Sequence, residues 1–261
     1  MNSAVATPID VKLMNMTTLV LGLAFVVLGA VAMARWVSRL PAFDIKGILV
    51  TGDVNHNNSV TLRANVAPRI NGTFFTVDLS RVRAAFESVP WVRRAVVRRD
   101  FPNRLRVELQ EHQPVAYWGS DGNVRLVNSY GEVFEANVGE VEQDMLPRLN
   151  GPEGQAAEAL AMYRSLADMF EQMSLPVEEV DLSSGGSWRV LLDTGAAIEM
   201  GRGSTEVVSA RAQRFLKTLT QVTARYGRQP GAVESADLRH ENGYAIRLRG
   251  VTTVVADGTK K

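Results

Sequence analysis

An uncharged apolar segment near the N-terminus most constrains how this chain folds. Residues 13–34 contain no charged side chain, and Leu, Val, Ala, Met and Gly dominate them. At about 1.5 Å per residue, a helix of this length crosses the roughly 30 Å hydrocarbon layer of a bilayer. A helix is required there, because lipid offers backbone groups no hydrogen-bond partners. We therefore predict a transmembrane helix over residues 13–36, with Trp36 at the membrane interface.

A cleaved signal peptide is the alternative interpretation of this segment. Ala30, Ala32 and Ala34 are spaced as in the small-x-small pattern of a cleavage site. The apolar region of a signal peptide usually runs for about 7 to 15 residues. The longer run found here favours a retained anchor.

The charges that flank the segment leave its orientation open. Arg35, Arg39 and Lys46 follow it, whereas only Lys12 and the terminal amine precede it. Taken literally, the positive-inside rule would keep the C-terminal bulk in the cytoplasm. The rule weakens when a long domain follows the helix, as it does here.

Composition excludes several classes of site. The chain carries 29 Lys and Arg against 28 Asp and Glu, so no overall field singles out nucleic acid as a partner. Cysteine is absent, which excludes disulfides, thiolate metal sites and a cysteine nucleophile. The three histidines lack the spacing of a zinc site, and no serine lies in a Gly-x-Ser-x-Gly motif. We expect no catalytic residue, no cofactor, no metal and no small-molecule substrate.

The first soluble module is predicted to run strand, helix, helix, strand, strand. Asp78 is a suitable N-cap for a helix whose apolar residues recur at spacings of three, four and three. After a turn at residues 101–103, apolar and charged residues alternate, which predicts a strand with one buried face. The elements are expected near residues 43–51, 60–70, 79–89, 92–99 and 105–110.

The second module is predicted to be an antiparallel β domain with two helices, so the fold class is α+β. Turn signals such as Asp121-Gly122 separate short apolar runs. One helix is expected to follow residues 151–154, and another to begin near Ser204 and end at Gly227. The strands are expected near residues 115–118, 124–128, 132–136, 180–182, 188–192, 197–200, 233–239 and 244–249.

Both modules resemble the FtsQ/DivIB family of division proteins over about residues 36–249. The N-terminal module is similar to the POTRA module of that family, and the C-terminal module is similar to its β domain. The resemblance implies a cytoplasmic tail (1–12), a transmembrane helix (13–36), a POTRA domain (43–112), a β domain (113–251) and a C-terminal tail (252–261). The residues that carry it are Pro90-Trp91-Val92, Val96-Val97-Arg98-Arg99, Phe101-Pro102, Leu105-Arg106-Val107, residues 111–118 and 149–154, Ser187-Trp188, Gly201-Arg202-Gly203 and Asp237-Leu238-Arg239.

The resemblance also implies a function. Such proteins are single-pass type II proteins of the inner membrane that gather at the division septum with their domains in the periplasm. They bind FtsB-like and FtsL-like partners, and through them septal synthases like FtsW and FtsI. A scaffold of this kind is not an enzyme and binds no nucleic acid. A POTRA-containing accessory of protein transport or outer-membrane assembly is the main alternative, and a periplasmic hydrolase is a weaker one.

The final strand is the candidate binding site. A terminal strand tends to be a sheet edge, whose N–H and C=O groups invite a partner strand. The family's FtsB-binding surface corresponds to residues 239–248 here. The sequence departs from better-known members at His240, where a tyrosine is familiar, and at Leu248, where a tryptophan is, so the prediction rests on backbone pairing. An edge that only closes the sheet is the alternative. The predicted site residues are Arg239, Asn242, Gly243, Tyr244 and Leu248.

A cluster of arginines in the first module allows another surface. Interleaved aromatic residues, which nucleic-acid binding would favour, are missing from it. A solvated face is the simplest interpretation, and a docking face for a protein or for lipid headgroups is the alternative. The cluster consists of Arg93, Arg94, Arg98, Arg99, Arg104 and Arg106.

Overall fold

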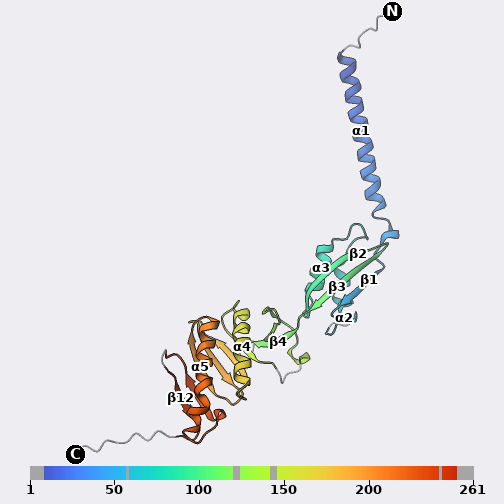
Figure 1. Ribbon diagram of the computed structural model, residues 1–261. Coiled ribbons are helices and arrows are strands. Elements are labelled where there is room, and N and C mark those ends of the chain that lie inside the picture. Colours follow the sequence, from blue (N-terminus) through green and yellow to red (C-terminus); the bar gives the residue numbers. More distant parts are fainter. Residues whose placement is uncertain (1–8, 57–58, 120–123, 142–145, 241–242, 252–261) are drawn as a thin grey trace, which may run out of the picture. The chain divides into compact units, whose positions relative to one another are not determined.

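The computed structural model describes residues 9–56, 59–119, 124–141, 146–240 and 243–251 (Figure 1). The chain divides after Glu111 into two compact units. The first contains the N-terminal helix and a three-stranded sheet, and the second contains a nine-stranded sheet in its described residues.

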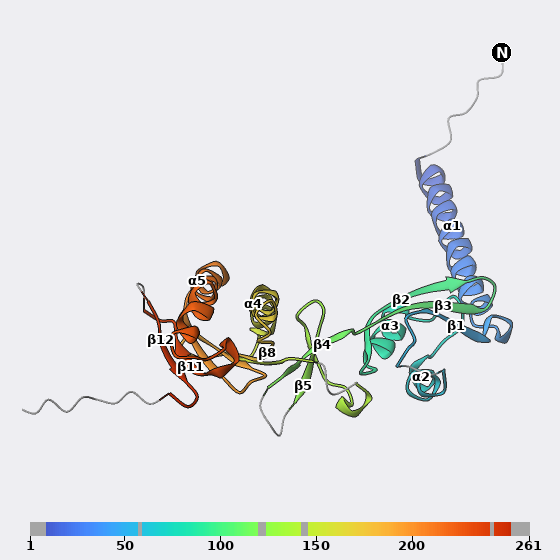
Figure 2. The same cartoon turned by 60° about the horizontal axis from the view of Figure 1, so that its bottom comes forward.

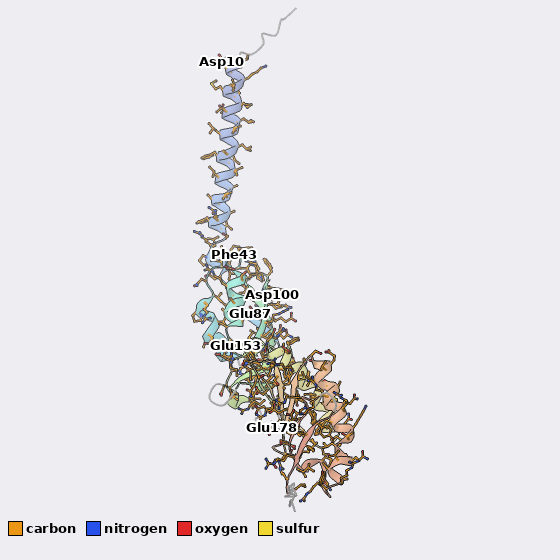
Figure 3. The ribbon with its side chains drawn as sticks, turned by 90° about the vertical axis from the view of Figure 1, so that its left-hand side faces the viewer. Asp10, Phe43, Glu87, Asp100, Glu153 and Glu178 are labelled. Atoms are coloured by element: carbon orange, nitrogen blue, oxygen red, sulfur yellow. The ribbon has the colours of Figure 1, made fainter. Side chains whose placement is uncertain are left out.

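Helix α1, Ile9–Val37, contains the apolar segment. Among the described residues it is the helix that is long and apolar enough to cross a membrane. Its side chains are exposed along its whole length, which is typical of a helix that faces lipid rather than a protein core. At 1.5 Å per residue it is about 44 Å long, so both ends reach past the hydrocarbon layer. Figure 3 shows Asp10 at one end and Phe43 just beyond the other.

The soluble part of the first unit has the predicted order of elements. Asp78 caps α3, because its carboxylate accepts hydrogen bonds from the N–H groups of Ser80 (2.9 Å) and Arg81 (3.3 Å). Strand β1 pairs in parallel with β3, and β3 pairs antiparallel with β2, giving the order β1-β3-β2. The elements are η1 (Pro41–Phe43), β1 (Gly47–Gly52), α2 (Ser59–Val66), η2 (Ala67–Arg69), α3 (Leu79–Glu87), β2 (Val92–Asp100) and β3 (Arg104–Glu111).

The core of the first unit lies between this sheet and its helices. Val82 and Phe86 of α3 are buried, as are Leu105 and Val107 of β3. Trp91, at the corner between α3 and β2, is also buried. The opposite face of the sheet carries exposed charged side chains, because strand residues alternate between the two faces.

The second unit has a sheet with helices on one face. Figure 2 shows α4 and α5 side by side over the same side of the strands. The strand order is β12-β11-β10-β9-β8-β7-β4-β5-β6. The elements are β4 (Pro114–Trp118), β5 (Arg125–Asn128), β6 (Val133–Phe134), η3 (Val138–Glu140), β7 (Arg148–Asn150), α4 (Ala156–Glu171), β8 (Val177–Leu182), β9 (Ser187–Leu192), β10 (Ala197–Arg202), α5 (Thr205–Ala224), η4 (Pro230–Ala232), β11 (Val233–Asp237) and β12 (Ala245–Leu248).

The α+β class is confirmed, but the sheet is mixed rather than wholly antiparallel. Strands β4 and β7, β7 and β8, and β10 and β11 pair in parallel. Helix α4 connects β7 to β8, and α5 connects β10 to β11. A chain that leaves one strand, crosses the sheet through a helix and returns beside that strand runs in the same direction again. The β7–β8 and β10–β11 pairs are parallel for this reason.

Alternation along the strands gives the sheet one covered face and one open face. Trp188, Val190 and Leu192 of β9 are buried beneath the helices, whereas Arg189 between them is exposed. Phe215 of α5 is buried against the same core. The open face and the free ends of the sheet are therefore the surfaces on which a site can form.

Candidate partner-binding edge

Strand β12 forms one end of the large sheet. Its pairing partner in the described part of the chain is β11, with Asp237 opposite Ala245, Ala236 opposite Ile246 and Val233 opposite Leu248. Figure 2 shows β12 beyond β11 at the margin of the sheet. The prediction that the last strand is an edge is therefore confirmed for these residues.

The direction of the backbone groups along β12 follows from one hydrogen bond. The N–H of Arg249 donates to the carbonyl of Ala232 (2.8 Å). Because successive residues of a strand direct their N–H and C=O groups to opposite sides, Arg247 and Ala245 also face β11. The N–H and C=O groups of Ile246 and the N–H of Leu248 therefore face away from β11, along the open edge. The carbonyl of Leu248 on that side accepts a hydrogen bond from the N–H of Val251 (3.3 Å), in the turn that follows β12.

Two of the predicted site residues hold β12 in place. The ring of Tyr244 packs edge-on against Phe215 of α5, with centroids 4.9 Å apart, and its hydroxyl lies 2.7 Å from Oγ1 of Thr218. The side chain of Leu248 is only 6 % exposed and belongs to the core. Tyr244 and Leu248 therefore fix the strand to the helix side of the sheet, and Leu248 presents only its backbone to the edge.

Gly243 and Asn242 precede the strand. Gly243 is exposed, and an added Cβ there would meet no atom within 4 Å, so glycine is not sterically required. Asn242 lies outside the described residues.

Arg239 forms a local ion pair at the end of β11. Its guanidinium donates from Nε to Oδ1 (2.9 Å) and from Nη2 to Oδ2 (2.6 Å) of Asp237, and its backbone N–H donates to Oδ1 (3.0 Å). The hydrogen bonds from the Arg239 side chain lower the pKa of Asp237 to about 2, although partial burial of the carboxyl opposes this shift. The pair is thus a fixed cation and a fixed anion at neutral pH.

The two sides of the edge differ in chemistry. On the open face, Arg247 of β12 pairs with Glu234 of β11 (3.1 Å). On the helix side, Tyr244 and Ile246 are half-buried apolar residues at the margin of the core. A strand added to β12 would therefore meet charged groups on one side and apolar groups on the other.

Two family profiles match these units. "POTRA domain, FtsQ-type" matches residues 43–112, and "Cell division protein FtsQ/DivIB, C-terminal" matches residues 116–239. The chain is 42 % identical over 243 residues to "Cell division protein FtsQ" of Burkholderia pseudomallei, which covers 93 % of this chain and 94 % of the relative. The chain belongs to the FtsQ/DivIB family.

Further relatives carry the same description. "Cell division protein FtsQ" of Thiomonas arsenitoxydans is 38 % identical, over 94 % of this chain and 89 % of the relative. That of Bordetella pertussis is 37 % identical, over 91 % of this chain and 90 % of the relative. This FtsQ-family chain is thus a cell-division protein with an FtsQ-type POTRA domain and a candidate membrane helix. The C-terminal profile match ends at Arg239, before β12.

Sequence reasoning missed several residues of the edge. The backbone of Ile246 faces the open edge. Asp237 binds Arg239. Tyr244 contacts Phe215 and Thr218. The alternation of Tyr244, Ile246 and Leu248 was a visible signal for Ile246. Phe215 and Thr218 come from a distant helix, which no local pattern connects to β12.

The other candidate sites have structural partners. His56 stacks on Trp91 (3.9 Å between ring centroids) and places Nδ1 3.3 Å from Glu111. His112 stacks on Phe134 (4.1 Å). In the ranges that the structure describes, no three His, Asp or Glu side chains gather as metal ligands.

The six arginines of the predicted cluster differ in their contacts. Arg99 donates to the carbonyls of Phe74 (2.6 Å) and Val77 (2.9 Å), and Arg93 donates to Gln110 (3.1 Å). The other four have exposed side chains on β2 and β3. They are Arg94, Arg98, Arg104 and Arg106.

Replacing Arg239 with alanine is expected to raise the pKa of Asp237 from about 2 toward 3.8. A lowered pKa in the folded state stabilises the fold above the unfolded pKa, and this contribution is lost as the pH falls through the folded pKa. The stability advantage of the parent over the variant should therefore shrink between about pH 4 and pH 2. At neutral pH this advantage should be small, because the guanidinium of Arg239 is exposed and solvent screens its charge. NMR titration of the Asp237 carboxyl measures the shift. Arg164→Ala on α4 is the control that should leave it unchanged, because the guanidinium of Arg164 donates to the carbonyl of Ser129 beside β5, near the other end of the sheet.

Proposed function

We propose that this FtsQ-family chain is a division scaffold that binds FtsB-like and FtsL-like partners and links them to septal peptidoglycan synthesis by enzymes like FtsW and FtsI. The observation that carries the proposal is the edge strand β12, which directs the N–H and C=O groups of Ile246 and the N–H of Leu248 away from β11. Family membership supports the division-complex role.

The proposed mode of binding is strand addition. An extended segment of the partner pairs with β12, and main-chain hydrogen bonds to the N–H and C=O groups of Ile246 and to the N–H of Leu248 provide affinity. Alternate side chains of the added segment meet Ala245 and Arg247 on one face and Tyr244 on the other. Selectivity then comes from a segment that is polar on one side and apolar on the other.

We propose the inner membrane of the septum as the location, in single-pass type II orientation. Residues 1–12 lie in the cytoplasm, residues 13–36 cross the membrane, and the POTRA domain (43–112) and β domain (113–251) lie in the periplasm with the tail 252–261. The exposed apolar surface of α1 and its length support the anchor. Family membership supports the orientation.

Binding rather than catalysis is proposed for the edge. A carboxyl with a pKa of about 2 is a poor proton donor or base at neutral pH, and Asp237 has one. Its partner Arg239 remains a cation. The pair therefore suits electrostatic selection of a partner better than proton transfer.

In-cell photocrosslinking tests the proposal. A photoreactive residue replaces Ala245, which is exposed on β12, and in a second strain it replaces Tyr226, which is exposed after α5. We expect position 245 alone to capture a small membrane protein with a coiled coil, and a fluorescent fusion of the chain to gather at mid-cell. Equal capture at both positions, or diffuse fluorescence, would contradict the scaffold. Capture of an outer-membrane barrel protein would favour the transport accessory instead.

A further inference from the structure

We propose that the membrane-proximal end of the first unit docks onto the bilayer that α1 crosses. The contact surface is the aromatic pole, defined as Phe43, Phe74, Phe75 and Phe101, together with the basic residues around it. Its partner is the interfacial layer of a membrane that contains anionic phospholipid. This inference rests on the proposed insertion of α1.

Strand pairing places the pole at the end where the chain leaves α1. Strand β1 follows α1, and it pairs in parallel with β3, so that Gly47 lies opposite Arg104. The first residues of β1 and β3 therefore share one end of the sheet. The turn between β2 and β3, which contains Phe101, lies at that end because Asp100 pairs with Arg104. The N–H of Lys46 donates to the carbonyl of Asn103 (2.9 Å), which ties the two segments together.

The connection from α1 to the pole is short and hydrogen-bonded. Five residues separate Val37 from Phe43, so the connection has six Cα–Cα steps and cannot exceed about 22 Å even when extended. The N–H of Phe43 donates to the carbonyl of Leu40 (3.0 Å), which shortens it. The hydroxyl of Thr73 donates to the carbonyl of Ser38 (2.6 Å), so the loop before Phe74 contacts the end of the helix directly. The pole therefore lies within reach of the headgroup layer.

Four phenylalanines from three segments meet at the pole. Phe43 contacts Phe75 (4.8 Å between centroids), Phe75 contacts Phe74 (5.2 Å), and Phe74 contacts Phe101 (6.2 Å). Phe74 is buried beneath the others, whereas Phe75 is 49 % and Phe101 is 78 % exposed. Beyond α1, no large apolar side chain among the described residues is more exposed than Phe101. Exposed apolar residues grouped in this way mark a contact surface.

Charge at the pole suits a membrane that contains anionic lipid. The segments that build the pole, residues 38–47, 73–77 and 99–104, carry more basic than acidic side chains, and Asp100 is 3.5 Å from Arg106. Basic residues beside interfacial aromatic residues are typical of surfaces that bind anionic lipid. The basic residues are Arg39, Lys46, Arg99 and Arg104, and the acidic residues are Asp44 and Asp100.

Because the chain contains no cysteine, a single introduced cysteine can be labelled selectively, and its depth in the bilayer can then be measured. The full chain is reconstituted in vesicles of phosphatidylethanolamine and phosphatidylglycerol as three variants, Val27→Cys, Phe101→Cys and Val54→Cys, each labelled with the fluorophore NBD. Val54 follows the last residue of β1 and therefore lies at the end of the three-stranded sheet opposite the pole. All three parent side chains are exposed, so the substitutions do not disturb a core. Lipid that carries a doxyl quencher is expected to suppress NBD emission at positions 27 and 101 and to leave position 54 unchanged.

A further set of variants tests the charge. Arg104→Glu is introduced into the Phe101→Cys background. It is expected to lower the ratio of molecules with a docked pole to molecules with an undocked pole by fivefold or more. One basic residue near an anionic surface changes such an equilibrium by about fivefold. The same substitution should have little effect in phosphatidylcholine vesicles. If position 27 is quenched but position 101 is quenched no more than position 54, the inference is overturned and the anchor is left intact. Absence of quenching at position 27 would overturn the anchor and the inference with it.

Discussion

Replacing Trp188 with alanine is expected to lower the free energy of unfolding of the second unit by about 3–5 kcal/mol. The indole is only 1 % exposed and lies on β9, between the sheet and its helices. Strand β9 pairs with β8 on one side and β10 on the other, so the backbone cannot move inward to fill the space. The loss therefore includes both the apolar transfer term and a residual cavity.

Urea unfolding of the full chain in detergent, followed by circular dichroism, measures this loss. The transition of the second unit should move to lower urea, and that of the first unit should stay in place because the two have separate cores. Tyr226→Ala is the matched control, since that ring is 58 % exposed and its removal should change stability by no more than about 0.5 kcal/mol. Equal shifts for the two variants would show that Trp188 does not support the core.

The first unit could be predicted from sequence because its signals are local. The spacing of apolar residues after Asp78 defines one helical face, and that face is buried. Alternation after residue 103 defines a strand with one buried face, and Leu105 and Val107 are buried as expected. In both cases the element contains enough residues to reveal its period.

The strand directions of the second unit could not be predicted in the same way. Direction depends on which strands become neighbours, and this is decided by how α4 and α5 cover the sheet. Strand β7, Arg148–Asn150, was missed because three residues are too few to distinguish the alternation of a strand from chance. It is nevertheless central to the sheet, since it joins β4 to β8.

In the candidate site, too, features set by neighbouring residues could be predicted from the sequence, whereas contacts with a distant helix could not. That the last strand is an edge followed from its place in the sequence. The pairing of Arg239 with Asp237 is also local, because an aspartate side chain readily accepts a hydrogen bond from the backbone N–H two residues further along the chain. The burial of Leu248 and the packing of Tyr244 on Phe215 depend on α5, which no pattern near residue 248 reveals.

Replacing Ile246 with proline is expected to weaken partner capture by about tenfold to a hundredfold. The N–H of Ile246 faces away from β11, so proline removes a donor that a partner strand needs and not one that β11 uses. A partner carbonyl left without a donor costs about 1–3 kcal/mol, and the proline ring also blocks close approach. Edge strands tolerate proline where the N–H faces solvent, so the sheet should remain folded. Crosslinking yield from position 245 measures the loss.

Ile246→Ala separates the backbone effect from the side-chain effect. Alanine removes the same half-buried side chain but keeps the N–H, so this variant should retain most of its capture if strand addition is the mode of binding. Circular dichroism of both variants checks that the second unit remains folded. If proline and alanine reduce capture equally, the partner recognises the Ile246 side chain and not the backbone. If neither reduces it, the partner binds another surface, and the edge of β12 only closes the sheet.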